Sequence, residues 1–227
     1  MTVIVAGSRG LIGQHMVQFI MNTLLEEVIE LDVALGHDLT DEAYVREFFA
    51  SPQGQASSIV NLFAFNDHVA SGEKRGTLFD LPLQSFRDCL EVNLTSLFSV
   101  CREYARNNKH GNIVNFGAST GIVSARPDMY DGAHKHVGYS VSKAGVAHLT
   151  RILAVHLAPD IRVNCIVPGG VSHDQPIEFK NLYGSYAPMG RMASLKDLEP
   201  AMRMLLSQDN RYMTGAEIII DGGWTII

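Results

Sequence analysis

The sequence is poor in cysteine, tryptophan and clustered positive charge. Its 227 residues include three cysteines and one tryptophan, and the net charge is −6 with no run of lysine or arginine. A protein that binds nucleic acid or an acidic membrane through charge shows a basic patch, so the composition argues against both partners. No apolar stretch approaches the ~18 residues that span a bilayer, and the first residues are typical of a core strand, not a signal peptide. We therefore expect a soluble, cytoplasmic protein.

The cysteines and histidines form no metal-binding pattern. Cys89, Cys101 and Cys165 are far apart and odd in number, with no CxxC spacing, so we expect buried free thiols. His134 and His136 lie close together, but two histidines without a third ligand are more often surface residues. The sequence therefore predicts no metal site.

Short β-rich apolar runs alternate with helical patterns along the whole chain. We expect strands at 2–6, 27–31, 58–62, 111–116, 161–166 and 216–220, and helices at 11–24, 41–50, 84–107, 137–158 and 195–206. Strands that are apolar on both faces and alternate with helices are typical of a parallel sheet covered on both sides. No linker interrupts the pattern, so we predict one doubly wound α/β domain over residues 1–227.

One connection in this pattern is too short. Only five residues, Val33–His37, separate Asp32 at the end of the second strand from Asp38. A crossover helix with its connections needs at least about 10 residues. We predict that the helix expected after the second strand is missing, and that the strand expected before Asp38 is very short or vestigial.

Three glycines follow the first strand and open the first helix. Gly7 permits a tight turn, Gly10 lets backbone approach a pyrophosphate, and Gly13 allows the helix to pack closely on the strand. The free N–H groups and the dipole of a helix N-terminus hold phosphate groups. We predict that this loop binds a dinucleotide through Gly7, Arg9, Gly10, Leu11, Ile12 and Gly13.

Two charged residues bear on the choice of dinucleotide. A carboxylate at Asp32 accepts hydrogen bonds from the adenosine ribose and repels the 2′-phosphate of NADP. Arg9 argues the other way, because a guanidinium in the glycine loop can pair with that phosphate. We favour NAD, with NADP not excluded.

Tyr139 and Lys143 stand four residues apart at the start of a helical pattern, which places both on one helix face. A tyrosine with a pKa of ~10 is a poor acid–base catalyst near neutral pH. An ammonium beside it favours the phenolate and lowers that pKa. We predict that this pair handles the proton of the reaction.

Taken in order, these motifs resemble those of the short-chain dehydrogenase/reductase family. The resemblance covers essentially the whole chain. Besides the glycine loop and the tyrosine–lysine pair it includes Asp38-Leu39-Thr40, Val60-Asn61, Asn93 within 91–94, and the segments 161–164, 168–171, 214–215 and 221–223. It implies a Rossmann-type fold and an NAD(P)-dependent oxidoreductase that interconverts a secondary alcohol and a ketone.

The resemblance also implies roles for single residues. Tyr139 would exchange a proton with the substrate oxygen, Lys143 would bind the nicotinamide ribose, and Asn93 would hold a water in a proton relay. Asp38 would contact the adenine ring, and Val171 the carboxamide through its backbone. The remaining cofactor contacts would be Leu39, Asn61, Pro168 and Gly169.

The chain departs from the family pattern at several points. The glycine spacing is that of the family's extended branch, and Asn61-Leu-Phe-Ala replaces the usual Asn-Asn-Ala-Gly. The slot of the catalytic serine, three residues after Asn115, holds Ala118, and His173 replaces a threonine. We assign the serine role to the neighbouring Ser119, brought in by a local bulge. The alternative is that this role is vacant.

The segment 122–138, just before Tyr139, is longer than the minimal family pattern. Its polar residues, with His173, Asp174 and Gln175, would suit a hydroxyl-rich or charged substrate, unless the segment is a solvated loop. A weaker resemblance to members from surface-polysaccharide and nonulosonic-acid sugar pathways favours a sugar-derived substrate. The rival functions are reduction of a 3-oxoacyl thioester and a weakly catalytic, dinucleotide-binding regulatory role.

The predicted helix 137–158 is apolar on all sides. Between Val137 and Ala158 the only formally charged residues are Lys143 and Arg151, and the residues Trp224–Ile227 are also mostly apolar. A helix that covers one face of a sheet keeps a polar outer side. We therefore expect a homodimer or homotetramer. The alternative is a monomer whose helix is covered by residues 122–136.

Overall fold

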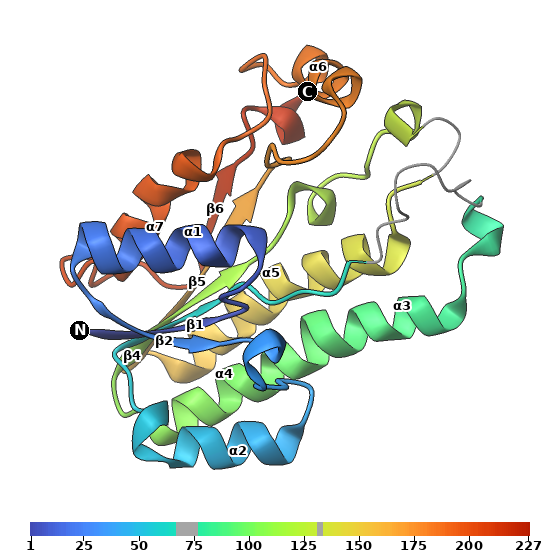
Figure 1. Ribbon diagram of the computed structural model, residues 1–227. Coiled ribbons are helices and arrows are strands. Elements are labelled where there is room, and N and C mark those ends of the chain that lie inside the picture. The colour runs from blue at the N-terminus through green and yellow to red at the C-terminus, as the bar shows by residue number, and fades with distance from the viewer. Residues whose placement is uncertain (67–76, 131–133) are drawn as a thin grey trace.

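The computed structural model describes residues 1–66, 77–130 and 134–227. Six parallel strands form one sheet in the order β2-β1-β3-β4-β5-β6 (Figure 1). The strands are β1 (Thr2–Ala6), β2 (Glu27–Leu31), β3 (Ser58–Asn61), β4 (Gly111–Phe116), β5 (Ile161–Pro168) and β6 (Glu217–Ile220). All six predicted strands are therefore present, with small shifts at their ends.

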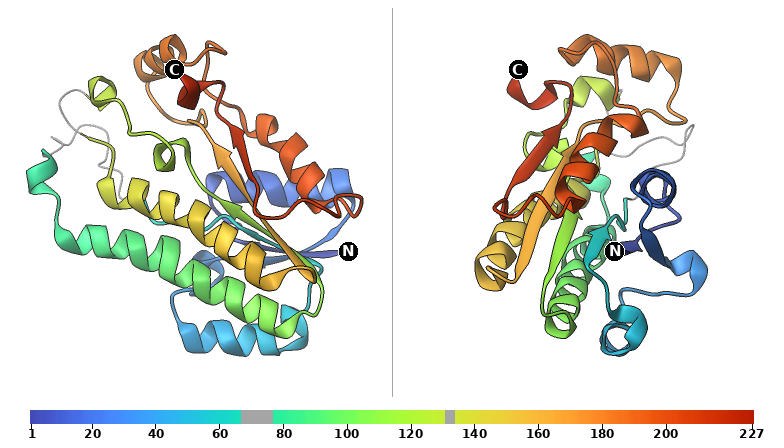
Figure 2. Two further views of the ribbon diagram at one scale, coloured as in Figure 1. Left: turned by 180° about the vertical axis from the view of Figure 1, so that it is seen from behind. Right: turned by 90° about the vertical axis from the view of Figure 1, so that its left-hand side faces the viewer.

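Helices cover both faces of the sheet, as Figures 1 and 2 show. One face carries α1 (Leu11–Phe19) and α7 (Glu199–Leu206), and the other carries α2 (Glu42–Ala50), α4 (Ser96–Asn107) and α5 (Val137–Leu157). Along β1, Val3 and Val5 pack in the core of the first face, whereas Ile4 and Ala6 pack in the core of the second. Burial on both faces explains why these strands are continuously apolar. The predicted doubly wound α/β fold is confirmed.

Wider helical turns interrupt two of the predicted helices. α1 continues into a π-helical turn, Ile20–Leu24, and the predicted helix 84–107 is divided into α3 (Leu83–Leu90), a π-helical turn (Glu91–Thr95) and α4. Such turns are frequent at functional sites because they re-aim the side chains around them. The second of them contains Asn93. A further helix, α6 (Ile177–Tyr186), was not predicted.

The crossover helix predicted to be missing after β2 is absent, and the strand predicted to be very short or vestigial before Asp38 does not form at all. Residues Val33–Leu35 form a 3₁₀ turn capped by Asp32, whose Oδ1 accepts a hydrogen bond from the Ala34 N–H at 2.9 Å. The chain then passes through Asp38 into α2 with no strand between, so β2 is an edge strand. The five residues after Asp32 form this turn and its exit, so no residues are left to form a strand that pairs with β2.

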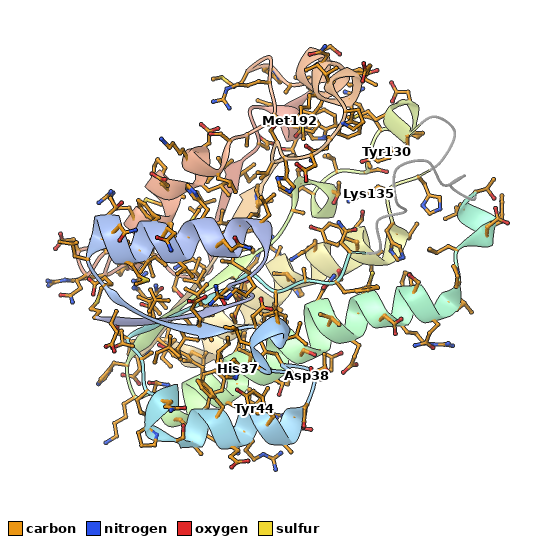
Figure 3. All side chains as sticks on the ribbon, in the orientation of Figure 1. His37, Asp38, Tyr44, Tyr130, Lys135 and Met192 are labelled. Atoms are coloured by element: carbon orange, nitrogen blue, oxygen red, sulfur yellow. The ribbon has the colours of Figure 1, made fainter. Side chains whose placement is uncertain are left out.

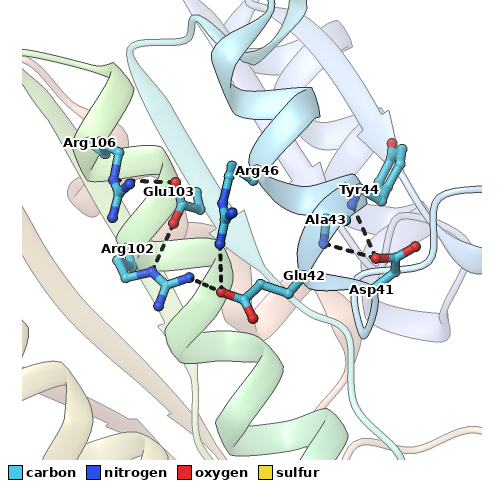
Figure 4. A network of polar contacts seen from close by, with 8 residues as sticks. All are labelled: Asp41, Glu42, Ala43, Tyr44, Arg46, Arg102, Glu103 and Arg106. Atoms are coloured by element: carbon cyan, nitrogen blue, oxygen red, sulfur yellow. Dashed lines mark hydrogen bonds and ion pairs between the residues drawn. The ribbon is translucent and has the colours of Figure 1, made fainter.

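Ion pairs fix α2 against α4 next to this shortened connection (Figure 4). Arg102 of α4 bridges Glu42 of α2 and the buried Glu103 of its own helix, with an N–O distance of 2.8 Å to each. Arg106 pairs with the other carboxylate oxygen of Glu103 at 3.4 Å, so two arginines balance the charge of this fully buried side chain. The α2 layer is therefore held in place without an additional strand.

No helix within the described ranges is long and apolar enough to cross a membrane.

Candidate active site

A cavity of about 560 Å³ opens where the strands end. Its wall is formed by the start of α1, the turn after β4, the start of α5 and the segment after β5. In open parallel sheets the carboxyl ends of the strands are where ligands bind. The predicted site residues that line the cavity are Leu11, Ile12, Ser119, Tyr139, Pro168, Gly169 and Val171.

The glycine loop presents bare backbone beside this cavity. Gly7 has a φ of +83°, and a Cβ on Gly13 would lie 2.0 Å from the Gly7 carbonyl oxygen, so only glycine allows α1 to approach this closely. Gly10 is exposed, and its N-cap position provides no side-chain hydrogen bond to the first N–H groups of α1. An open cradle at a helix N-terminus fits a pyrophosphate. Binding of a dinucleotide by this loop stays a prediction, and the open backbone at Gly10 is compatible with it.

Asp32 and Arg9 are arranged around the same loop. The second carboxylate oxygen of Asp32 accepts a hydrogen bond from the Arg9 backbone N–H at 2.9 Å, while the Arg9 guanidinium pairs with Glu30 at 3.2 Å. The Arg9 charge is thus partly balanced by a strand neighbour, and the Asp32 carboxylate is fixed at the end of β2. Both contacts reduce the attraction of this end of the site for an additional phosphate.

Tyr139 and Lys143 lie on the first turns of α5. The Lys143 Nζ donates a hydrogen bond to the Phe116 carbonyl at the end of β4, at 2.8 Å, and lies 5.8 Å from the centre of the Tyr139 ring. Burial raises the pKa of Tyr139 to about 12, with the nearby Cys89 adding to this, and burial lowers the pKa of Lys143 to about 8. The predicted lowering of the tyrosine pKa is not produced by this arrangement, because burial dominates at both groups.

Asn93 ties the loop after β3 to α5. Its side-chain amide exchanges two hydrogen bonds with the backbone of Phe65, at 2.6 and 2.8 Å, and donates a third to Ser142 Oγ at 2.9 Å. Ser142 in turn donates to the Tyr139 carbonyl at 2.7 Å. In this structure the Asn93 side chain therefore connects the loop after β3 to α5 and supports the helix turn that carries Tyr139.

The turn after β4 is pressed against α5. A Cβ on Gly121 would lie 2.7 Å from the Ala144 backbone nitrogen, so the 3₁₀ turn Ser119–Gly121 reaches this position only with glycine at its end. Ala118, Ser119 and Thr120 all line the cavity, and Ser119 is buried. The Ser119 side chain therefore belongs to the cavity wall, although the family's position for the catalytic serine is occupied by Ala118.

Comparisons with known proteins agree with this geometry. The family model described as "Enoyl-(Acyl carrier protein) reductase" matches residues 13–225. A short-chain dehydrogenase of Leptospira borgpetersenii serovar Hardjo-bovis, solved with bound NAD⁺, is 29% identical with a TM-score of 0.88, and the match covers 99% of this chain and 92% of that one.

Curated relatives with similar sequences are also named as dehydrogenases. Cis-4-hydroxycyclohexanecarboxylate dehydrogenase of Sinomonas cyclohexanicum is 29% identical over 84% of this chain and 75% of its own length. NADP-dependent mannitol dehydrogenase of Alternaria alternata is 30% identical over 66% of this chain, and the match spans 56% of the relative.

The chain belongs to the short-chain dehydrogenase/reductase family. The predicted family is thereby confirmed, and with it an NAD(P)-dependent oxidoreductase that interconverts an alcohol and a ketone.

Several predicted cofactor residues of this dehydrogenase/reductase do not line the cavity, among them Asp38, Leu39 and Asn61. The buried Asn61 donates to Asn115 at 2.9 Å, so its side chain belongs to an internal network. Leu39 is buried in the core of the α2 and α4 face. Asp38 accepts hydrogen bonds from the backbone and hydroxyl of Thr40, which lower the pKa of its carboxyl group. Contacts of Asn61 and Leu39 with a cofactor would have to come from backbone atoms.

The segment 122–138 does form part of the cavity, apart from residues 131–133, which lie outside the described residues. Met129, Tyr130, His134, Lys135 and His136 line the cavity, as does Gln175 after β5. A solvated loop with no access to the site is therefore excluded. His173 and Asp174 instead form an exposed pair with each other, 3.0 Å apart.

The prediction that His136 is a surface residue is wrong. His136 is buried at the N-cap of α5, where its Nδ1 accepts a hydrogen bond from the Tyr139 N–H at 3.2 Å and its Nε2 lies 2.8 Å from Ser85 Oγ. The sequence signal was available, since a polar side chain precedes the first helical residue. No cluster of three metal-ligating side chains occurs among the residues that the structure describes.

Sequence reasoning missed the aromatic end of the cavity. Tyr183 of α6 stacks on Trp224 with ring centres 4.2 Å apart, and its hydroxyl accepts a hydrogen bond from the Gly170 N–H at 2.7 Å. Both rings line the cavity. Neither residue belongs to a local sequence motif, and only the fold brings them next to the segment after β5.

The three cysteines are buried free thiols, as predicted.

Proposed function

We propose that this protein transfers hydride between NAD(H) and a secondary alcohol or ketone of a polar, sugar-derived or sugar-like substrate, with Tyr139 as the proton-transferring group. The observation that carries the proposal is the placement of the Tyr139 phenol in the wall of a cavity that also borders the glycine loop. The nicotinamide supplies or accepts the hydride when the dinucleotide is bound. Every other part of the chemistry belongs to the chain.

The chain's residues divide this work between binding and proton handling. Gly7, Gly10 and Gly13 hold the pyrophosphate, and Asp32 binds the adenosine ribose. The Tyr139 hydroxyl donates a proton to the substrate oxygen during reduction, which suits a phenol that burial keeps protonated. Lys143, with a pKa lowered to about 8, supplies a replacement proton to the Tyr139 phenolate, is recharged from solvent, and would orient the ribose.

Ser119 supports the same step from the turn after β4, which packs against α5. Its position beside the Ala118 slot and in the cavity lining makes it our candidate for the hydroxyl that stabilises the substrate oxygen. Such a donor contributes about 2.7–4 kcal/mol to a transition state in well-studied sites.

The preference for NAD rests on charge. The Asp32 carboxylate stands at the end of β2, and the one cation of the loop, Arg9, is paired with Glu30. The polar substrate class is supported by relatives named for mannitol, glucose and hydroxycyclohexanecarboxylate.

We also propose a cytoplasmic homo-oligomer. Val141, Ile152 and Val155 expose apolar side chains on the outer face of α5, and Ile219 does so on β6. An apolar face of this kind marks a contact surface. Three free cysteines suit a reducing compartment.

The function is tested in two stages. Nicotinamide fluorescence on titration with NADH measures binding, and turnover is then followed across a panel of polyols, sugars, hydroxy acids and one 3-oxoacyl thioester. We expect saturable binding and turnover of a polar alcohol or ketone. Binding without turnover of any member favours the regulatory alternative, and turnover of the thioester alone favours the acyl reductase.

A further inference from the structure

A lysine other than Lys143 lines the cavity beside the reacting tyrosine. We propose that Lys135 binds a carboxylate of the substrate, so that the protein acts on a hydroxy acid or its oxo acid. This inference rests on the proposed function, because it names the substrate class of the same site. The inference goes beyond the proposed function because it assigns substrate specificity to Lys135, a residue that belongs to no sequence motif.

Lys135 lies close to the reaction centre. It precedes the N-cap of α5, and its Nζ is 4.8 Å from the centre of the Tyr139 ring. The same Nζ lies 3.5 Å from Asn66 Oδ1. Figure 3 shows Lys135 between Tyr130 and the start of α5. An anion bound by this ammonium would therefore belong to the small molecule whose oxygen meets the tyrosine.

The charges of the described lining leave Lys135 as its fixed cation. The other fully charged side chain there is Asp80, whose carboxylate accepts hydrogen bonds from the backbone and hydroxyl of Thr77 at 2.6 and 2.8 Å. His136 also borders the cavity, but its Nδ1 serves as acceptor for the Tyr139 N–H. Among the described lining residues, Lys135 is therefore the lysine or arginine whose charge can attract a substrate anion.

The remaining wall strengthens that attraction. Met129, Phe179, Met192 and Trp224 give the cavity a mostly apolar lining. Opposite charges interact more strongly where the surroundings are less polar than water. A single ammonium matches the single charge of a carboxylate, whereas a phosphate dianion would gain from additional donors.

The only tryptophan of the chain, Trp224, lines the cavity and reports on its occupation. We would titrate the NAD⁺-loaded protein with cyclohexanecarboxylate, its uncharged amide and cyclohexyl phosphate, and follow Trp224 emission. We expect the carboxylate to bind roughly tenfold more tightly than the amide. The preference should disappear in Lys135→Met and persist in Lys109→Met, which removes an exposed lysine just after the C-terminal end of α4.

Three results would overturn the assignment. They are equal affinity for carboxylate and amide, a carboxylate preference that survives in Lys135→Met, and no saturable response to the carboxylate. Tighter binding of the phosphate than of the carboxylate would replace the proposed group by a phosphate.

Turnover separates this inference from the proposed function. We would compare 4-hydroxycyclohexanecarboxylate with its amide as substrates. The wild type should have the higher kcat/KM for the carboxylate, and in Lys135→Met the ratio of the two kcat/KM values should fall to about one. If Lys135 acted instead by changing the proton affinity of Tyr139, the pH profile of kcat would shift equally for both substrates, which would contradict a binding role. If the titration shows a carboxylate preference but nothing is turned over with either dinucleotide, the proposed function fails and the anion site stands.

Discussion

The choice between NAD and NADP gives the structure a quantitative test. Asp32→Asn removes one negative charge at the end of β2, while the amide oxygen can still accept one of the two backbone hydrogen bonds that the carboxylate accepts now. Glu30→Gln removes the partner of Arg9 and releases its guanidinium. Both changes should raise the relative use of NADPH, for different reasons.

The expected size follows from Coulomb's law. Two unit charges about 5 Å apart interact by roughly 3 kcal/mol at an effective dielectric constant of about 20. Screening at a half-exposed position reduces this to about 1–2 kcal/mol, so Asp32→Asn should raise the NADPH-to-NADH ratio of kcat/KM about tenfold. The exposed Arg9–Glu30 pair is worth at most about 1 kcal/mol, so Glu30→Gln should raise the ratio a few-fold.

The assay is a pair of kcat/KM values for each variant at fixed ionic strength. Glu27→Gln is the matched control, since Glu27 lies on the same strand at its opposite end and should leave the ratio unchanged. A wild type that already prefers NADPH tenfold would refute the assignment of Asp32. So would an Asp32→Asn variant whose ratio equals that of the control.

The other expectations concern stability, catalysis and assembly. Burial holds the pKa of Lys143 at about 8 against 10.5 for an ordinary lysine, so unfolding takes up a proton between these values. The free energy of unfolding of the wild type relative to Lys143→Met should therefore rise from pH 8 to 9 by up to about 1.4 kcal/mol in urea titrations, and a flat difference would contradict the burial. Ser119→Ala should lower kcat on the order of a hundredfold, while Thr120→Ala should change it little; an effect of Ser119→Ala under about threefold would leave the hydroxyl role vacant. Light scattering at micromolar concentration should give two or four times the chain mass of 24.9 kDa, and a monomer would refute the oligomer.

The framework of the fold could be predicted because its signals are local. Strands buried on both faces are continuously apolar, and the glycines of the first loop stand at fixed spacing from β1. The strand expected before Asp38 was inferred from the alternation of strands and helices, and it is absent because the turn Val33–Leu35 occupies the connection. α6 was missed because few of its residues are buried, which leaves a weak helical pattern.

In the site, too, features with a local sequence signal could be predicted, whereas features that depend on the fold could not. Tyr139 and Lys143 follow from their spacing on one helix, but the pKa of each depends on burial, which spacing does not reveal. Asn61 turns into the core because Asn115 on the adjacent strand offers a partner. Lys135 and Trp224 line the same cavity only because of the fold, since they are far apart in the sequence and neither belongs to a motif.

The central claim is that the Tyr139 hydroxyl moves the substrate proton while the glycine loop holds the dinucleotide. Tyr139→Phe removes that hydroxyl and little else, so single-turnover hydride transfer and NADH affinity should be measured together on this one variant. The account predicts that turnover of the best alcohol or ketone falls by at least about a thousandfold, while the Kd for NADH stays within a few-fold of wild type. Wild-type turnover in Tyr139→Phe would contradict it.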